Sequence, residues 1–221
     1  MKDYREKEMK QLLGVLLLLC IYYCTPVFKI ISKSSSFFNE FVSMVKYIIS
    51  LGVISLCVFL FDCLITSEMK NKLVGLFCIP MAGEVIFTKI FENKIKDKRF
   101  TYKEARKRYD DIILNRPQNT QEKRNYENAC WFSIYQKYKN DGAVVQSQKD
   151  FLTCRDLFSE IVLFAIMYLI SIVLFKSFII FSWEFIFILV ALGTVINCST
   201  HVKMNRFVNS VIAIDIAKGE K

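Results

Sequence analysis

Residues 161–198 decide the fold, because IVLFAIMYLISIVLF at Ile161–Phe175 is followed closely by FIIFSWEFIFILVALGTVINC at Phe178–Cys198. Two further apolar runs, Gln11–Ser32 and Phe41–Thr66, lie in the first third of the chain. A bilayer core about 30 Å thick needs roughly 20 apolar residues per helix, which the first two runs supply and the last two reach with their flanks. Of the 221 residues, 53% are hydrophobic, which is more than a soluble protein of this size tolerates. We therefore predict an all-α integral membrane protein with four transmembrane helices, arranged as two hairpins with a helical cytosolic insert.

The basic residues that flank the apolar runs predict the orientation. Glu92–Asp156 carries fifteen Lys and Arg against ten Asp and Glu, and residues 201–221 add four more basic side chains. Both segments should stay in the cytoplasm, with the turn near residues 176–182 outside. The expected location is the cell inner membrane, crossed several times, with both termini cytoplasmic.

The N-terminal residues could instead form a cleaved signal peptide. The leader Met1–Lys10 carries Asp3, Glu6 and Glu8, and no cleavage site of small residues follows the apolar run. Leu12–Ile31 is therefore predicted to be a retained helix.

Five segments follow from these patterns. We expect a first transmembrane hairpin at 1–67, an interfacial or re-entrant apolar segment at 68–90, a basic helical cytosolic insert at 91–156, a second transmembrane hairpin at 157–200 and a cytosolic tail at 201–221. The second segment includes Leu73–Ile90, whose alternative is a fifth crossing that would move the N-terminus outside. Pro80, Glu84 and Lys89 argue against that alternative, because a charge at membrane depth costs several kcal/mol unless it is partnered.

The insert should consist of three helices. Thr101 with Glu104 three residues later predicts a capping box, and Arg116–Pro117 should end that first helix. A second helix is expected over 121–138, followed by a turn at Asn140–Gly142. A third should begin near Ala143 and continue without a break into the third crossing.

Four polar residues are possible functional groups: Asp62, Glu84, Arg155 and Asp156. Asp62 is either an interfacial acid paired with a nearby lysine or an acid that faces a bundle interior or an aqueous path. Arg155 and Asp156 are adjacent charges without a catalytic partner, which favours a solvated or salt-bridged face.

Basic side chains cluster just after the segment 68–90, and such a position favours anionic lipid headgroups at about 1 kcal/mol per residue. Phosphates of a nucleic acid are the weaker alternative, and an acidic partner protein is a further one. The residues predicted to contact lipid or a partner are Lys94, Lys96, Lys98, Arg99, Lys103, Arg106, Lys107 and Arg108.

No motif for catalysis or cofactor binding is present. A P-loop, a dinucleotide fingerprint and a nucleophile elbow are all missing from the sequence. Six of the eight cysteines lie in or beside apolar runs, where Cys acts as a small hydrophobe, and His201 is the single histidine. We expect no enzyme activity, no cofactor and no metal site.

The stretch WFSIYQKYKNDGAVVQSQKDFLTCRD at residues 131–156, set between two apolar hairpins, resembles four-helix membrane components of bacterial anti-phage defence systems. These include the transmembrane subunit of Kiwa, the membrane effectors of retrons and pore-forming effectors linked to cyclic-nucleotide signalling. The resemblance lies in the layout, and it aligns no functional residue. It implies a protein that acts as a homo-oligomer beside a soluble cytosolic partner encoded nearby, and that senses infection or disrupts the membrane.

The predicted function is thus that of a membrane-embedded component of an antiviral defence system. The alternative is a small channel, transporter or accessory membrane subunit, for which Asp62 as a pathway acid is the best support. A membrane-bound enzyme acting on lipid is a third hypothesis, supported only by polar residues near the cytoplasmic interface.

Overall fold

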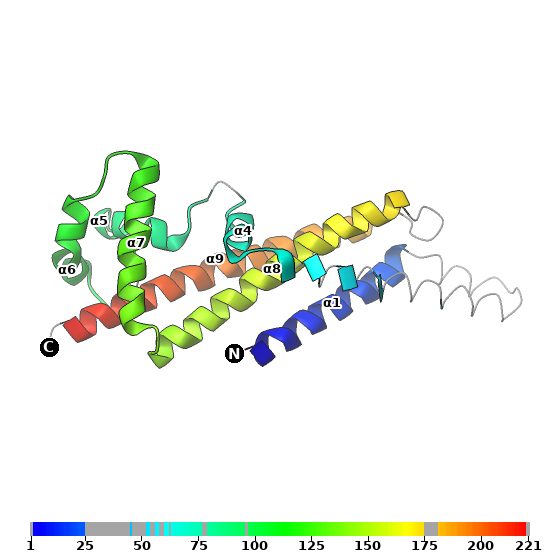
Figure 1. The fold of residues 1–221 in the computed structure, drawn as a ribbon, viewed down its shortest axis with the longest axis horizontal. Helices are drawn as coiled ribbons and strands as arrows, with labels where there is room; N and C mark the ends of the chain where they lie inside the picture. Colours follow the sequence, from blue (N-terminus) through cyan, green and yellow to red (C-terminus); the bar gives the residue numbers. More distant parts are fainter. Residues whose placement is uncertain are drawn as a thin grey trace, which may run out of the picture. The chain divides into compact units, whose positions relative to one another are not determined.

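The computed structural model shows helices joined by short loops (Figure 1). It describes residues 2–24, 45, 52–53, 56–57, 60–61, 63–76, 79–95, 97–174 and 181–219, and none of these residues forms a strand. The helices are α1 (Lys2–Cys24), α4 (Ser67–Val74), η1 (Ala82–Glu84), α5 (Ile86–Phe91), α6 (Tyr102–Leu114), α7 (Thr120–Tyr138), α8 (Gly142–Leu174) and α9 (Trp183–Gly219). The all-α prediction is confirmed for this part of the chain.

The chain divides into two compact units. Unit 1 comprises residues 1–70 and 153–198, and unit 2 comprises residues 71–152 and 199–221. The division assigns 20 Lys and Arg and 12 Asp and Glu to unit 2, a net charge of +8, whereas unit 1 has 10 against 9. Because the whole chain carries +9, nearly all of its net charge belongs to unit 2.

The core of unit 1 contains side chains from α1, α8 and α9. Leu16 of α1 packs with Phe164 and Tyr168 of α8 and with Phe185 of α9, and all four are buried. The rings of Tyr168 and Phe185 meet edge to face with centroids 4.9 Å apart. This core is narrow, and many apolar residues of the same helices lie outside it.

Within the part of the chain that the structure describes, two helices, α8 and α9, are long and apolar enough to cross a membrane, judged by length and composition. In the most apolar 18-residue window of each helix, 44% and 22% of the residues are buried within the chain. Of the 26 large hydrophobic residues found exposed among the described residues, 20 belong to unit 1. Among the described residues of unit 1, many apolar side chains are therefore exposed.

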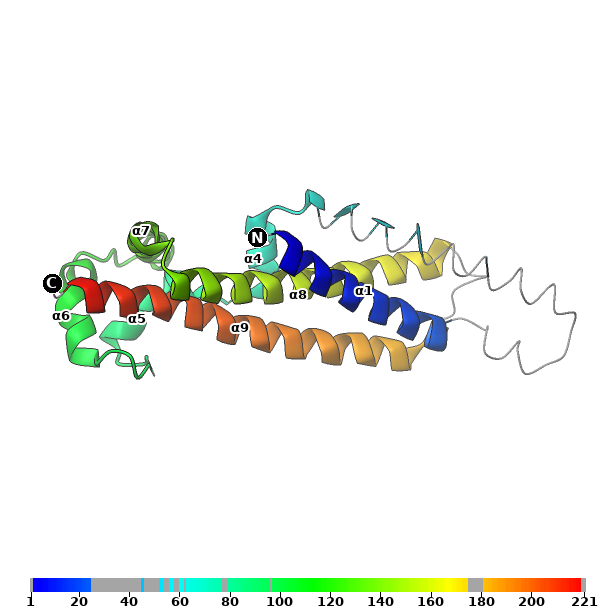
Figure 2. The same ribbon diagram turned by 90° about the horizontal axis from the view of Figure 1, so that it is seen from below.

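The core of unit 2 is built around the second part of α9. Phe207 packs edge to face on Trp131 of α7 at 5.4 Å and stacks on Phe151 of α8 at 6.2 Å. On the other side, Phe87 of α5 meets Tyr109 of α6 at 5.2 Å. Both views place α5 and α6 beside the C-terminal end of α9 (Figures 1 and 2).

Local signals account for the helix ends in unit 2. The Thr101 side chain accepts from Glu104 N while the Glu104 carboxylate accepts from Thr101 N, which is the predicted capping box. Asn119 caps α7 through Gln121 N at 2.9 Å. The expected turn at 140–142 separates α7 from α8, and α8 is one unbroken helix as predicted.

Residues 73–90 do not form a spanning helix. A turn follows α4, where Leu76 has φ 47° and a Cβ on Gly75 would lie 2.4 Å from the Ile79 carbonyl oxygen. The chain then forms η1 and the six-residue α5. Ile86, Phe87 and Ile90 are buried in the core of unit 2. The apolar side chains of this segment thus contribute to a protein core, and its described residues do not form one helix long enough to cross a membrane.

The residues predicted to form a cytosolic tail pack into the core of unit 2. Residues 201–219 are helical and belong to α9. Met204, Val208, Val211 and Ile212 are buried, the last two with no exposed surface. Their spacing of three and four residues places them on one helix face, which packs into the core of unit 2.

The first predicted hairpin is described only in part. α1 contains an apolar stretch at Lys10–Cys20, shorter than a full span. Residues 25–44, and most of 46–62, lie outside the described residues.

Candidate functional site

Unit 1 contains a buried ion pair at the predicted residues Arg155 and Asp156. The Nε and Nη2 atoms of Arg155 each lie 3.0 Å from Asp156 Oδ1. Lys70 of α4 places its Nζ 3.7 Å from the same oxygen, and none of the three side chains is more than 7% exposed. Glu160, one turn further along α8, is also buried. The pair is therefore salt-bridged and enclosed, and it is not a solvated face.

The other predicted polar residues have separate environments. Glu84 belongs to unit 2, where its Oε2 accepts a hydrogen bond from Met81 N at 3.1 Å and caps η1. Asp62 and Lys96 lie outside the described residues. The structure thus brings Arg155 and Asp156 together and gives Glu84 a local structural role.

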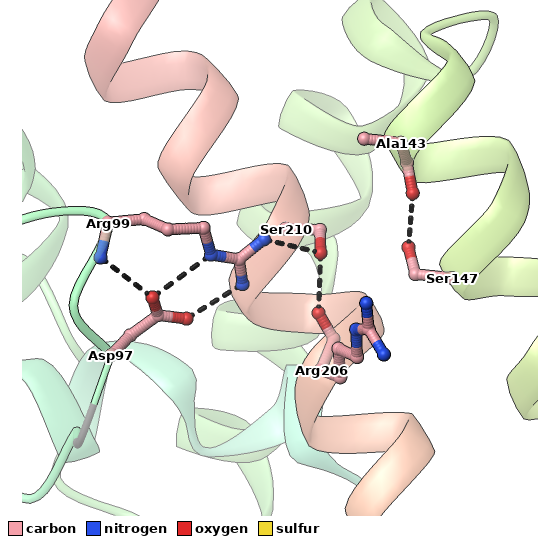
Figure 3. Close-up of polar contacts among 6 residues, drawn as sticks. All are labelled: Asp97, Arg99, Ala143, Ser147, Arg206 and Ser210. Atoms are coloured by element: carbon pink, nitrogen blue, oxygen red, sulfur yellow. Dashed lines mark hydrogen bonds and ion pairs between the residues drawn. The ribbon is translucent and has the colours of Figure 1, made fainter.

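The arginines of the basic stretch are held by unit 2 itself. Arg99 chelates Asp97 at 2.7 and 3.0 Å and reaches the Ser210 hydroxyl of α9 at 2.9 Å (Figure 3). Ser210 in turn donates to the Arg206 carbonyl at 2.8 Å. Arg106 donates to the Tyr102 hydroxyl at 2.6 Å. Its guanidinium lies 5.0 Å from the centre of the Phe91 ring. These side chains tie loops to helices and are less available to an outside ligand than the sequence suggests.

The lysines of the same stretch differ from the arginines. Lys94 pairs only with Glu92, and both are exposed. Lys98, Lys103 and Lys107 are exposed and have no hydrogen bond or ion pair with any residue that the structure describes. Among the residues predicted to contact lipid or a partner, the lysines are therefore the ones whose side chains are accessible to an outside ligand.

Glu127 of α7 is a completely buried carboxylate in unit 2. It accepts a hydrogen bond from Thr88 N at 3.0 Å and another from the Thr88 hydroxyl. Arg116, which follows α6, places its Nη1 3.6 Å from the same carboxylate. A buried charge is tolerated only when it is paired and hydrogen-bonded, so this set of contacts joins α5 and the end of α6 to α7.

Asp215 of α9 is a second buried carboxylate in unit 2. It accepts from the Tyr109 hydroxyl at 2.7 Å, the Tyr138 hydroxyl at 3.0 Å and Arg108 Nε at 3.3 Å. Burial and the bond to Asp215 raise the pKa of both phenols, so that they donate throughout the physiological range. The same carboxylate raises the pKa of Arg108. Asp215 thus connects α6 and α7 to the last turns of α9.

Sequence reasoning missed both acids. Asp215 stands in the apolar run VIAIDIA at 211–217, and an acid at an apolar helix position is a detectable sign of burial. Glu127 has no such sign, because its partners are 11 and 39 residues away in the chain.

No group of three or more His, Cys, Asp or Glu side chains within the described residues could hold a metal ion. The cysteines that the structure describes in detail, including Cys130 and Cys154, are not in disulfide bonds. The sequence matches no protein-family model, no curated protein and no solved structure. A function must therefore be argued from the residues of this chain.

Proposed function

We propose that the protein is a multi-pass membrane component of a bacterial anti-phage defence system, which acts with a soluble cytosolic partner and has no enzyme activity of its own. The observation that carries the membrane part of this proposal is the concentration of exposed apolar side chains in unit 1. The defence part rests on the layout of the sequence, in which residues 131–156 lie between two apolar hairpins.

Lipid is the environment that suits the surface of unit 1. Burial of apolar surface away from water is worth about 25 cal/mol per Å², and monomeric soluble proteins rarely expose large contiguous apolar patches. Leu18 of α1, Val173 of α8 and Phe187 of α9 are 67%, 68% and 80% exposed. Acyl chains would cover these side chains at no cost in polar contacts.

The charge of unit 2 favours the cytoplasmic side. Basic segments close to membrane helices are retained in the cytoplasm, and unit 2 holds +8 of the net charge. Its buried acids and paired arginines are typical of a domain that folds in water. The runs at 11–32 and 41–66 would add a first hairpin, giving four crossings with both termini inside.

The continuity of α8 and α9 supports a role in transmitting a signal. Each helix begins or ends in unit 2 and continues into unit 1 without a break. Binding of a partner to unit 2 would act on the same helices that cross the membrane. Four helices per chain cannot enclose a wide pore, so disruption of the membrane would require a homo-oligomer.

A cell-based experiment tests the proposal. The gene is expressed with and without its neighbours, the cells are challenged with phage, and membrane potential is followed with a voltage-sensitive dye. We expect the protein in the membrane fraction, with protection or depolarisation that depends on the neighbouring partner. A soluble protein, or a membrane protein without either effect, contradicts the proposal.

The buried charges of unit 1 favour one alternative, a channel or transporter. Arg155, Asp156 and Glu160 lie at the start of the apolar part of α8, where charged groups often mark an ion path. In that case Asp156→Asn should abolish ion or proton flux in liposomes, whereas Glu184→Gln, at the start of α9, should not. Wild-type liposomes without flux would dismiss this alternative.

A further inference from the structure

A small cavity in unit 2 is lined by one cation and no acid. It has a volume of about 220 Å³ including its open mouth, and it is bounded by Lys89, Ile90, Asn93, Ile95, Phe100, Tyr102 and Ala105. Its walls come from α5, the loop after it and the first turns of α6. The backbone of Asn93 is left-handed, with φ 52°, and the hydrogen bonds from Asn93 N to Ile90 O and from Lys94 N to Lys89 O close the end of α5. The lining is therefore held by the fold.

The ammonium group of Lys89 has no counter-ion among the residues that the structure describes. Its one hydrogen bond goes to a neutral acceptor, Asn205 Oδ1 of α9, at 3.2 Å. No carboxylate among the described residues lies within salt-bridge distance of Nζ. Burial lowers the pKa of Lys89, and no nearby acid opposes this shift. Lys89 is thus a half-buried cation whose one side-chain hydrogen bond among the described residues goes to a neutral group.

The remaining polar groups of the cavity suit an oxyanion. An ammonium that gives one hydrogen to Asn205 keeps two further donors. Asn93 contributes an amide, whereas the Tyr102 hydroxyl accepts from Arg106 Nη1 at 2.6 Å and donates its one hydrogen to Phe91 O at 3.5 Å. The free lysines Lys98 and Lys103 are close to the lining residues in sequence and would attract an anion toward it.

We propose that this cavity binds a phosphate group, with Lys89 as the principal ligand and Asn93 as a neutral hydrogen-bonding partner. The cavity is too small for a drug-sized molecule, so a ligand would place only a small polar group in it. The phosphate is either that of a lipid headgroup or that of a soluble compound, since both present the same oxygens. The site does not depend on the membrane role proposed above.

Amine labelling of the wild-type protein tests the site directly. Full-length protein in detergent is acetylated briefly with and without 20 mM inorganic phosphate, and each lysine is quantified by mass spectrometry. Bound phosphate should shield the Lys89 amine and favour its unreactive protonated form. We expect labelling of Lys89 to slow at least fivefold, with less than a 1.5-fold change at Lys107, which is exposed on α6. Chloride at matched ionic strength controls for screening.

Two membranes distinguish the sources of the phosphate. The protein is labelled in nanodiscs of phosphatidylcholine alone and in nanodiscs that also contain phosphatidic acid, without free phosphate. Protection of Lys89 by phosphatidic acid identifies a headgroup site, and protection by free phosphate alone identifies a soluble ligand. Either result supports a phosphate site. Equal protection by chloride, equal protection of Lys107, or no protection by either probe overturns it.

A pair of variants supplies a second measurement. Lys89→Met keeps the length of the side chain and removes its charge, and Lys107→Met removes the same charge from an exposed position. Phosphate affinity measured by calorimetry should fall at least tenfold in the first variant and stay within twofold in the second. Equal losses would indicate non-specific attraction and contradict the proposal. If Lys89→Met does not fold, as judged by Trp131 fluorescence, the labelling of the wild-type protein decides.

Discussion

Val190 and Val202 lie on the same helix, α9, and are equally exposed, at 64% and 66%. Val190 belongs to unit 1, where exposed apolar residues are the rule, and Val202 belongs to unit 2, where they are few. In unit 2, Glu127 and Asp215 are buried and hydrogen-bonded, and most of the exposed residues are polar or charged. In unit 1, many of the exposed residues are apolar. The comparison teaches that exposure alone does not identify a lipid-facing residue, and that the surroundings of the whole unit must be considered.

Loss of the Glu127 carboxylate should have the largest effect. Glu127→Ala removes the acceptor of the Thr88 hydrogen bonds and leaves Arg116 without its acid, so unit 2 should lose about 3–5 kcal/mol of stability. Denaturant unfolding is followed by Trp131 fluorescence in a Trp183→Phe background, since these are the two tryptophans.

Glu122→Ala, at an exposed position of the same helix, is the matched control and should cost less than about 1 kcal/mol. An equal cost for both variants would mean that the buried carboxylate does not stabilise unit 2.

The two valines give the second test. Val190→Asp should cost about 2.5–3.5 kcal/mol on membrane insertion if that part of α9 is in lipid. Val202→Asp should change insertion by less than about 0.5 kcal/mol, as for an ordinary surface substitution. The inserted fraction is measured after alkaline extraction of membranes. Equal behaviour of the two variants would remove the distinction between the units.

A smaller effect is expected at the start of α6. Thr101→Ala removes the side-chain acceptor for Glu104 N and should destabilise unit 2 by about 1 kcal/mol. Thr120→Ala, one residue after the Asn119 cap of α7, lacks that role and should be nearly neutral. Both are measured by the same denaturant unfolding. A Thr120→Ala effect as large as that of Thr101→Ala would exclude the cap as the cause.

The smallest expected effect is the loss of stability of unit 2 at low pH. Hydrogen bonds from Arg99 lower the pKa of Asp97. Burial alone would raise the pKa of Asp150, but bonds from Lys203 and Gln146 bring it below its ordinary value. A depressed folded pKa gives stability that is present above the ordinary Asp value of about 3.9 and is lost as pH falls through the folded value.

Each pair is partly exposed and should contribute less than about 1 kcal/mol. Thermal unfolding of unit 2 between pH 5 and pH 2.5 should show this loss, and the double variant Asp97→Asn with Asp150→Asn should flatten it. An unchanged pH profile in the double variant would assign the acid response to other groups.

Structural features that depend on residues close together in the sequence were predicted correctly. The capping box at Thr101, the turn at Asn140–Gly142 and the continuous α8 each depend on neighbours within about one turn, and all three are present. The apolar stretches of α8 and α9 were also found, because length and composition suffice for them.

The sequence did not predict which apolar residues pack in the core of unit 2. Phe87 and Phe207 lie in segments that we interpreted as interfacial and as a tail, and both belong to the core of unit 2. This packing is not evident from the sequence, because a hydrophobic face has the same periodicity whatever covers it. The partners of Asp215 are 77 to 107 residues away, so no local pattern reveals that Tyr109, Tyr138 and Arg108 meet there.

The position of Phe207 in the core of unit 2 has a consequence for biosynthesis. Trp131 and Phe151 leave the ribosome well before Phe207, their ring partner on α9. At about 5–20 residues per second, the stretch from residue 152 to residue 219 takes about 3–13 s to make. During that time both apolar helices are synthesised, and the core formed by residues 71–152 still lacks the side chains of α9. If α8 and α9 insert into a membrane as we propose, their insertion can begin before the core of unit 2 is complete.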